Sequence, residues 1–535
     1  MREQNSLKAT SLPLSRSARL AGVLETLALV CVLLAALALA ATSLFAAAKV
    51  NPDQYEILQI LVFKENQWCN LAVVALGIVF LVLLGRIPVS KRFNVAFGGC
   101  VLIFLGVFGA FWVTSVNAHA ESDGDVLIQI AERIIAGDYA PVATSGEYLH
   151  YYLVRFPYQC GLLFYLEVLV RLFGATGALG VARMINVALL VSSYGALLLI
   201  TQRLFRSERV TFLTILLLCA TPQPVLSCTF VYGLIPALAF GVWAFYFIVC
   251  YLQSGRKRNL IPAAVLLAAG VFLRSNTWIM LAAAAIVLAL HALRRKKPAP
   301  ALLAVLLVVA ALPLPGVAQR AYEERLGTSF GSGYPKSYWM AMSLQDGWKA
   351  AGWHVQAYQE MMQENYGEDV QAIDAQAKAD IRAGVSDLIK NPSALGEYLF
   401  EKLVSQWDEP TFLSIWITKS VKAYEEPEAL AKALYSDQFD RLFRLTEGQI
   451  IKILYFGFVL SALALLRKHT SEQLLLPVTI LGGFLFHLLF EAKSQYVLEY
   501  LPLLWPLAAF GVVSLGRQIW KTPGEPAGEG REEAE

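Results

Sequence analysis

The sequence has little charge and little histidine. Of its 535 residues, 16% are Asp, Glu, Lys or Arg and 57% are hydrophobic. Soluble domains have about a quarter charged residues, so this composition excludes a single soluble globular protein. The six histidines show no His-x-x-x-His spacing and no Cys-x-x-Cys pair occurs, so we predict no zinc site.

Cysteine is also sparse, at seven residues, an odd number. Four of them, Cys31, Cys100, Cys219 and Cys250, lie inside apolar runs. This pattern predicts packing thiols rather than a disulfide framework. The net charge of +3 is uninformative as a total, and we expect no nucleic acid among the partners.

Long apolar runs are what the sequence does contain. Their lengths approach the roughly 20 residues that cross a bilayer as a helix, which predicts an all-α polytopic membrane protein with about twelve transmembrane helices. The expected spans are residues 21–47, 69–85, 93–116, 180–202, 209–227, 230–252, 259–273, 276–293, 300–318, 449–466, 474–490 and 497–516. The lipid bilayer is therefore an expected partner of the chain.

Lysine and arginine gather on one side of this topology. Almost half of the 44 basic residues lie in residues 1–20, 86–92, 203–209, 256–258, 294–297, 467–468 and 517–521. The positive-inside rule makes that side cytoplasmic. We therefore predict a multi-pass cell-membrane protein with both termini in the cytoplasm, provided that residues 158–173 form a surface helix rather than a span.

The spans divide the chain into expected domains. These are a cytoplasmic N-terminus (1–20), an N-terminal transmembrane module (21–319) with an acidic outer loop (117–179), an extracytoplasmic helical domain (320–447), C-terminal transmembrane helices (448–516) and a cytoplasmic tail (517–535). The outer loop contains two amphipathic stretches, 126–137 and 158–173, which predict surface helices. Segment 320–447 has 13 basic and 20 acidic residues. It is interpreted either as a solvated cap or as a lid over an active site.

Three carboxylates, Glu121, Asp123 and Asp125, follow the apolar run that ends at Val116. Charged side chains at a membrane boundary are costly and often functional. Helix capping by Ser122 or Asp123 is the structural alternative. Capping does not account for three acids, and a carboxylate at this boundary can act as a general base or hold a divalent cation.

A series of short motifs follows the acids. In chain order they are Gly137-Asp138-Tyr139, Arg155-Phe156-Pro157-Tyr158-Gln159-Cys160-Gly161, Leu172-Phe173-Gly174, Val231-Tyr232-Gly233 and Glu491-Ala492-Lys493-Ser494-Gln495-Tyr496. Their order resembles that of the GT-C membrane glycosyltransferases, most clearly over residues 117–210. That superfamily includes the protein O-mannosyltransferases, the aminoarabinose transferases of lipid A and the oligosaccharyltransferase catalytic subunits.

The resemblance implies an enzyme that moves a sugar from a polyprenyl-phosphate carrier to an extracytoplasmic acceptor, which is a glycan, a lipid or a protein. Most such enzymes invert the anomeric carbon with one carboxylate as base. By position in the motif, Asp123 is the expected base, and Asp125 is an accessory acid or, where metal is used, a ligand. The active site is then extracytoplasmic.

The leaving phosphate needs cations rather than a proton donor. Arg274, Lys493 and Arg155 are the candidates to bind it. A snorkelling anchor is the alternative for Arg274, and an ion pair with Glu491 or Glu499 is the alternative for Lys493.

Substrate contacts are expected from residues of the matching motifs and from one outer tryptophan. The candidates are Tyr158, Gln159, Tyr232, Tyr496 and Trp339. For Trp339, packing or the interfacial aromatic belt is the alternative to a sugar contact.

Two departures from the GT-C pattern limit the comparison. Gly124 separates two aspartates where the family has Asp-Glu or a single Asp, and three spans precede the acids instead of one. The second outer loop, Gln223 to Tyr232, lacks an acid, which disfavours the metal-dependent chemistry of oligosaccharyltransferases. No cofactor is firmly implied, and Mg or Mn at the acids remains an option.

Two other functional classes remain as alternatives. A transporter or flippase of lipid-linked glycans would also place charges in a membrane protein, although no inverted repeat is visible and the spans carry few charges. The other alternative is a non-catalytic scaffold whose outer domain binds a partner.

Overall fold

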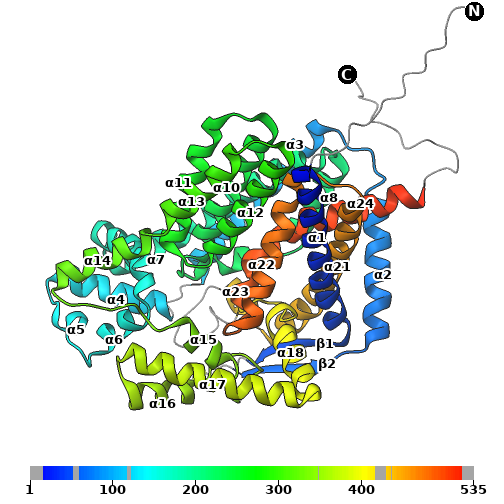
Figure 1. Ribbon diagram of the computed structural model, residues 1–535. Helices are drawn as coiled ribbons and strands as arrows, with labels where there is room; N and C mark the ends of the chain where they lie inside the picture. Colours follow the sequence, from blue (N-terminus) through cyan, green and yellow to red (C-terminus); the bar gives the residue numbers. More distant parts are fainter. Residues whose placement is uncertain are drawn as a thin grey trace, which may run out of the picture.

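The computed structural model describes residues 16–51, 59–116, 122–347, 349–415, 429–434 and 436–520. Helices dominate it (Figure 1). The apolar helices of the bundle are α1 (Arg16–Phe45), α2 (Gln67–Leu84), α3 (Lys91–Ser115), α7 (Cys160–Phe205), α8 (Glu208–Cys219), α9 (Gln223–Leu226), α10 (Leu234–Ser254), α11 (Leu260–Leu273), α12 (Thr277–Arg295), α13 (Ala299–Ala311), α21 (Asp437–Arg467), α22 (Leu475–Leu489) and α24 (Leu501–Ile519). The short helix α9 continues α8.

The number of candidate spans is smaller than expected. In the described ranges, ten helices are long and apolar enough to cross a membrane, and eleven if the bent pair Glu208–Cys219 and Gln223–Thr229 counts as one span. One of the twelve expected spans, 259–273, corresponds to α11, which has only 14 residues. With ~1.5 Å of rise per residue, such a helix is shorter than the hydrocarbon core of a bilayer. The chain is an integral membrane protein, with ten or eleven candidate spans rather than twelve.

The fold is not entirely helical. Strands β1 (Ala46–Asn51) and β2 (Gln59–Lys64) form an antiparallel hairpin between α1 and α2. Ala48 pairs with Val62 in its register, and the amide of Ala48 also donates to the Asp408 carbonyl at 3.0 Å. The sequence hid this hairpin because its first strand continues the alanine-rich run of the preceding span.

Helix α7 changes direction at Gly174. Its φ of 70° and ψ of 168° interrupt the helical backbone there, a conformation that glycine adopts at little cost. The break separates the expected surface helix, 158–173, from the expected span, 180–202. Which half lies in the bilayer plane stays a prediction.

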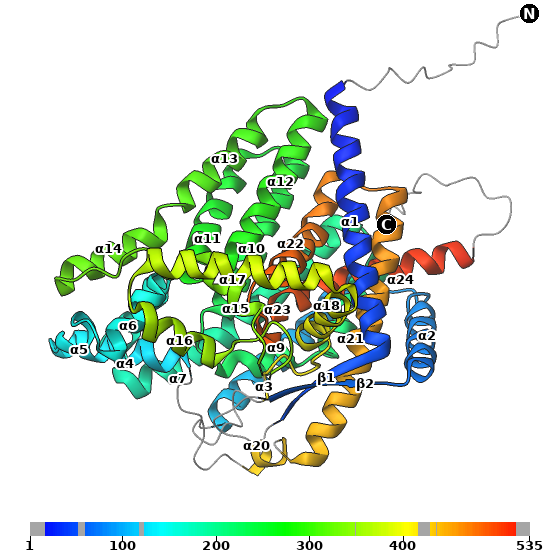
Figure 2. The ribbon, with the colours of Figure 1, turned by 60° about the horizontal axis from the view of Figure 1, so that its bottom comes forward.

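Shorter helices cover one end of the bundle. Three of them lie between α3 and α7: α4 (Asp123–Ala136), α5 (Ala140–Ala143) and α6 (Tyr148–Arg155). Six follow α13: α14 (Leu314–Leu326), α15 (Lys336–Ser343), α16 (Gln356–Tyr366), α17 (Val370–Lys390), α18 (Pro392–Trp407) and α20 (Ala429–Leu434). The last, α23 (Ser494–Val497), precedes α24. Figure 2 shows α15, α17 and α18 lying across the end of the bundle that also carries the hairpin. The division into domains stays a prediction.

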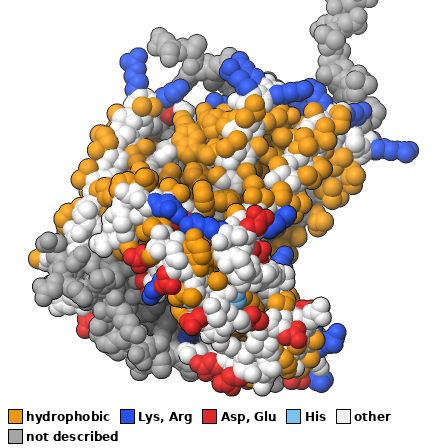
Figure 3. Space-filling model, turned by 90° about the vertical axis from the view of Figure 1, so that its left-hand side faces the viewer, with side chains coloured by type: hydrophobic (Ala, Val, Ile, Leu, Met, Phe, Trp, Pro, Cys, Tyr) orange, Lys and Arg blue, Asp and Glu red, His pale blue; other side chains and the backbone are white. Residues whose placement is uncertain are grey.

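The bundle core is packed closely at α21 and α24. A Cβ on Gly511 would lie 2.3 Å from the Gly457 carbonyl oxygen, and one on Gly457 would lie 2.6 Å from the Ala508 Cβ. Small residues at such crossings let two membrane helices approach closely, and the close contact stabilises their packing through van der Waals attraction. This attraction matters in a bilayer because the hydrophobic effect does not drive helices together there. Figure 3 shows the outer surface of the bundle as a hydrophobic band below a rim of Lys and Arg.

Candidate active site

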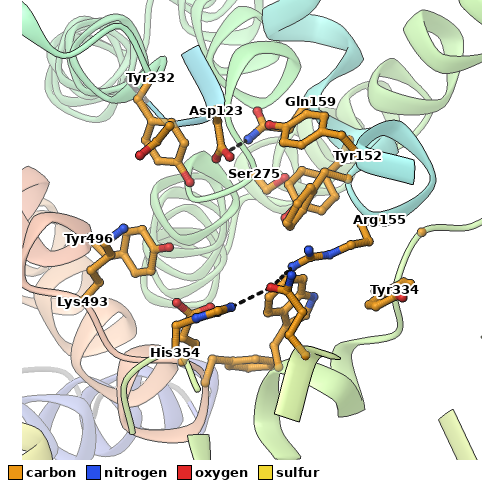
Figure 4. Close-up of a pocket in the computed structure, with 18 of the residues that line it drawn as sticks. Asp123, Tyr152, Arg155, Gln159, Tyr232, Ser275, Tyr334, His354, Lys493 and Tyr496 are labelled. Carbon is orange, nitrogen blue, oxygen red and sulfur yellow. Dashed lines mark hydrogen bonds between the residues drawn. The ribbon is translucent and has the colours of Figure 1, made fainter. Parts of the chain in front are cut away.

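A cavity of about 1520 Å³ lies between the outer helices and the ends of the bundle. All ten residues predicted to act in catalysis or binding line it: Asp123, Asp125, Arg155, Tyr158, Gln159, Tyr232, Arg274, Trp339, Lys493 and Tyr496. They come from both halves of the chain, and Figure 4 shows several of them pointing toward a common space. Their roles stay predictions, but their positions are compatible with one site.

Asp123 is the first residue of α4 and is half-buried. Ser122 before it has a φ of 52°, and its side chain makes no capping hydrogen bond. The Asp123 carboxylate accepts a long hydrogen bond, 3.4 Å, from Gln159 Nε2 (Figure 4). Capping by Ser122 therefore does not account for the acidic motif, and the Asp123 carboxylate has capacity for further donors.

Gly124 has a steric reason to separate the two aspartates. A Cβ at this position would lie 2.4 Å from the Val231 carbonyl oxygen. Only glycine lets the N-terminus of α4 approach the 229–233 segment this closely. That approach brings Asp123 beside Tyr232, so the departure from the family pattern has a local structural cause.

Two tyrosines flank the Asp123 carboxylate in Figure 4, Tyr152 and Tyr232. Burial raises the pKa of both phenols well above the ordinary value, and the negative charge of Asp123 raises it further. Both therefore remain protonated at neutral pH and can donate to oxygens in the cavity. The sequence pattern singled out Tyr232 but missed Tyr152, which lies in the interior of α6.

Asp125 lies one residue beyond Gly124 and is bound within its own helix. Gln129 Nε2 donates to Asp125 Oδ2 at 2.8 Å. Asp125 still lines the cavity, and the hydrogen bond that it accepts from Gln129 is shorter than the one that Asp123 accepts from Gln159. Glu121 lies outside the described residues. Within those residues, no group of three or more His, Cys, Asp or Glu side chains could hold a metal ion.

Arg274 and Lys493 form one side of the cavity, which we call the Arg274 wall, together with Tyr232 and Tyr496. Arg274 is buried; its guanidinium donates to the Tyr232 carbonyl at 3.1 Å and lies 4.2 Å from the Tyr232 ring centre. Lys493 Nζ lies 5.9 Å from the Tyr496 ring centre, and the Arg274 guanidinium 6.0 Å from the same centre. Tyr496 is thus an aromatic neighbour of both cations.

The alternatives for these two cations fit the structure poorly. Arg274 is buried and faces the cavity, whereas a snorkelling anchor points to the lipid–water boundary. In the part of the chain that the structure describes, no ion pair joins Lys493 to Glu491 or Glu499, and Arg274 Nε has no hydrogen-bond partner.

Arg155 lies on the opposite side of the cavity from Lys493 (Figure 4). It donates to Gln359 Oε1 at 2.9 Å, and His354 Nε2 contacts the same oxygen at 2.8 Å. Four aromatic rings surround its guanidinium at 4.6 to 5.9 Å: Phe156, Tyr334, Tyr151 and Trp339. Arg155 is thus separate from the Arg274 wall.

Trp339 is half-buried and stacks on Phe156 with ring centres 5.5 Å apart. It therefore packs against a neighbouring ring and also lines the cavity. Tyr158 and Gln159 contribute from the turn that opens α7.

Several cavity residues had no signal in the sequence. Lys349, Trp353 and His354 come from the polar connection between α15 and α16, which has no motif or periodicity. A direct backbone link holds this connection in place, because the amide of Ala492 donates to the Gly352 carbonyl at 2.7 Å. Only the three-dimensional structure brings this segment to the site.

Comparisons with known proteins give a distant structural likeness. No protein-family model and no curated protein matches the sequence. Among solved structures, the chain is similar to ArnT from Cupriavidus metallidurans bound to undecaprenyl phosphate, with 13% sequence identity and a TM-score of 0.33, covering 78% of each chain. A likeness this distant assigns no residue a role.

Proposed function

We propose that the protein is a GT-C-type glycosyltransferase that moves a sugar from a polyprenyl-phosphate carrier to an acceptor outside the cytoplasm. One observation carries the proposal: a half-buried carboxylate, Asp123, shares a cavity with the two cations of the Arg274 wall. The resemblance of the motif order to GT-C enzymes supports the same reaction. Asp125, Tyr158, Gln159, Tyr496 and Trp339 complete the proposed substrate contacts.

In the proposed reaction, Asp123 is the general base. Its carboxylate accepts the proton of an acceptor hydroxyl or amine while that atom forms a bond to the anomeric carbon. The bond from this carbon to the phosphate oxygen breaks on the opposite face, and its electron pair leaves with the lipid phosphate. The anomeric configuration is inverted.

The lipid phosphate leaves as an anion and needs no proton. Arg274 and Lys493 stabilise the charge that develops on its oxygens, in a partly desolvated site where cations act more strongly than in water. Tyr152 and Tyr232 donate hydrogen bonds to the reacting sugar. Arg155, on the other side of the cavity, donates hydrogen bonds to oxygen atoms of the donor or of the acceptor.

The membrane orientation belongs to the same proposal. The Lys- and Arg-rich connections make one face cytoplasmic, which puts both termini inside and the cavity outside. The outer helices α14 to α18 then cover the cavity from the extracytoplasmic side. A polyprenyl chain can remain in the bilayer while its phosphate reaches the Arg274 wall.

The test is turnover of a lipid-linked sugar. Purified protein is given polyprenyl-phosphate sugars, and transfer or hydrolysis of the carrier is measured beside the Asp123→Asn variant. We expect the wild type to act on at least one carrier and the variant to lose ~100- to 10,000-fold of the rate, the usual contribution of a general base.

A variant with full activity in that assay would disprove the base assignment. If neither protein acted on any carrier while the wild type moved lipid-linked sugars across vesicles, the protein would be a transporter. The unfolding temperature of the variant is the control: Asn has the size of Asp and can still accept from Gln159, so an unchanged unfolding temperature would show that the loss of rate is not a loss of folding.

A further inference from the structure

Lys349 lies in the connection between α15 and α16 and lines the cavity. Its backbone is fixed against the segment that carries Lys493. Gly352 accepts the hydrogen bond from Ala492 given above, and Trp353 and Ala492 form a parallel β-bridge. The connection around Lys349 is thus attached directly to the Arg274 wall.

Side-chain packing gives the same placement. Ala350, the residue after Lys349, belongs to one buried cluster with Ala492 and Trp353, and Tyr232 packs against that cluster. Tyr232 is the residue whose ring and carbonyl hold Arg274. Lys349 therefore stands beside the same group of residues that positions the two proposed phosphate-binding cations.

The charges around Lys349 are suited to an anion. Lys349, Lys493 and Arg274 all line the cavity, and its acidic lining residues are Glu491, Asp123 and Asp125. Of these acids, Glu491 is the one that acts on the charge of Lys349, and Lys493 acts on it in the opposite direction. An oxyanion in the cavity relieves the repulsion between the cations. A phosphate is the group that the proposed donor would supply.

We propose that Lys349 is a third phosphate-binding cation of the donor site, contributed by the outer helices, and that donor affinity depends on its charge. The inference rests on the proposed function, because it takes the Arg274 wall as the place of the lipid phosphate. It adds a residue that no motif identified and makes the outer segment part of the donor site.

The ionisation of Lys349 supports this role. Burial and, to a smaller extent, the positive charge of Lys493 lower the pKa of Lys349 to about 8, and Glu491 opposes the shift. Two more titratable groups lie at this connection. Burial lowers the pKa of His354, so His354 is neutral above pH 7, and burial lowers the pKa of Lys402, which packs against Gly352, to about 7. Lys349 therefore changes charge in a pH range in which its neighbour His354 stays neutral.

The sign of the pH effect follows from linkage. A bound phosphate stabilises the charged form of Lys349 and raises its pKa, so the affinity is greatest below pH 8. Above that pH, binding must take up a proton, and the affinity falls by at most about tenfold per pH unit. An arginine stays charged throughout and should remove this dependence.

The experiment measures the dissociation constant of undecaprenyl phosphate for the full-length protein in lipid nanodiscs, from pH 7.5 to 9.5. This phosphate monoester is already a dianion there, because its second pKa is about 6. We expect the wild-type affinity to fall about tenfold across the range. Lys349→Gln should bind about tenfold more weakly at pH 7.5. Lys349→Arg should bind as tightly as wild type at pH 7.5 and keep that affinity at pH 9.5, where it should bind about tenfold more tightly than wild type.

A matched control is Lys390→Gln, which removes one positive charge from the 74% exposed side chain at the end of α17. It should bind as the wild type does at every pH. If Lys349→Gln bound as wild type, or if the affinity of Lys349→Arg fell with pH in parallel with wild type, the role of Lys349 would be wrong while the proposed function stood. If the wild type bound no undecaprenyl phosphate at any pH, both proposals would fail.

Discussion

Two acidic residues of this membrane protein, Glu25 and Asp123, differ in how completely they are bound. Glu25 in α1 has no exposed surface. It accepts from Ser471 Oγ at 2.6 Å, pairs with Arg294 at 2.8 Å and lies 3.3 Å from His469 Nε2. These partners join α1 to α12 and to the connection between α21 and α22, so Glu25 fastens three parts of the bundle.

Asp123 has a different environment. It is half-buried beside a cavity, and the hydrogen bond that it accepts from Gln159 is long. Its surroundings contain the phenols of Tyr152 and Tyr232 but no ion pair like that of Glu25 with Arg294 among the described residues. The comparison teaches that burial alone does not distinguish the two acids; the cavity beside Asp123 does, and this is why we propose a catalytic role for Asp123 only.

The position of Asp123 should matter most. Gly124→Ala would put a Cβ 2.4 Å from the Val231 carbonyl oxygen and push the start of α4 away. Because a displacement of ~1 Å can cost about 100-fold in rate, we expect a loss of that order in kcat. The measurement is turnover of the carrier identified for the wild type. Wild-type kcat would show that the position of Asp123 does not limit the reaction; Gly137→Ala, at the open C-terminus of α4, controls for general damage to that helix.

Glu25 should affect stability and not chemistry. Glu25→Gln leaves Arg294 without its charge partner, but the Arg294 side chain is 43% exposed and remains solvated. We expect the free energy of unfolding to fall by about 1–3 kcal/mol, with kcat unchanged. Thermal unfolding in detergent measures the first and carrier turnover the second. A large fall in kcat at unchanged stability would contradict the division between the two carboxylates.

Asp125 should have the smallest effect. Its carboxylate already accepts a hydrogen bond from Gln129 within α4, so we expect Asp125 to contribute less to the rate than Asp123. Asp125→Asn should lower turnover less than about tenfold, below the usual contribution of a general acid or base. A loss as large as that of Asp123→Asn would mean that the two aspartates act as a pair. Turnover with and without Mg²⁺ would then test for a shared cation.

Much of the site could be predicted from the sequence because the physics of the membrane limits the options. The clusters of Lys and Arg predict which face of the bundle is cytoplasmic, and the motifs between the spans are therefore predicted to lie together on the opposite face. Asp123 in the first large loop, Arg274 at a helix end and Lys493 near the C-terminus do line one cavity. Their individual roles remain predictions.

Other features needed the structure. The hairpin of β1 and β2 follows a run of alanines with no alternation of polar residues, and α11 is a short helix inside an apolar stretch of ordinary composition. Lys349 and His354 belong to a polar connection whose place is set by pairing with Ala492, far away in the sequence. Such non-local contacts leave no local pattern to read.

The link between Gly352 and Ala492 has a consequence for biosynthesis. The cavity wall that holds Lys493 and Tyr496 comes from a much later part of the chain than Asp123, Arg155 and Arg274. During membrane insertion, the cavity is therefore assembled only after the segment that carries Lys493 has been made and has paired with Gly352.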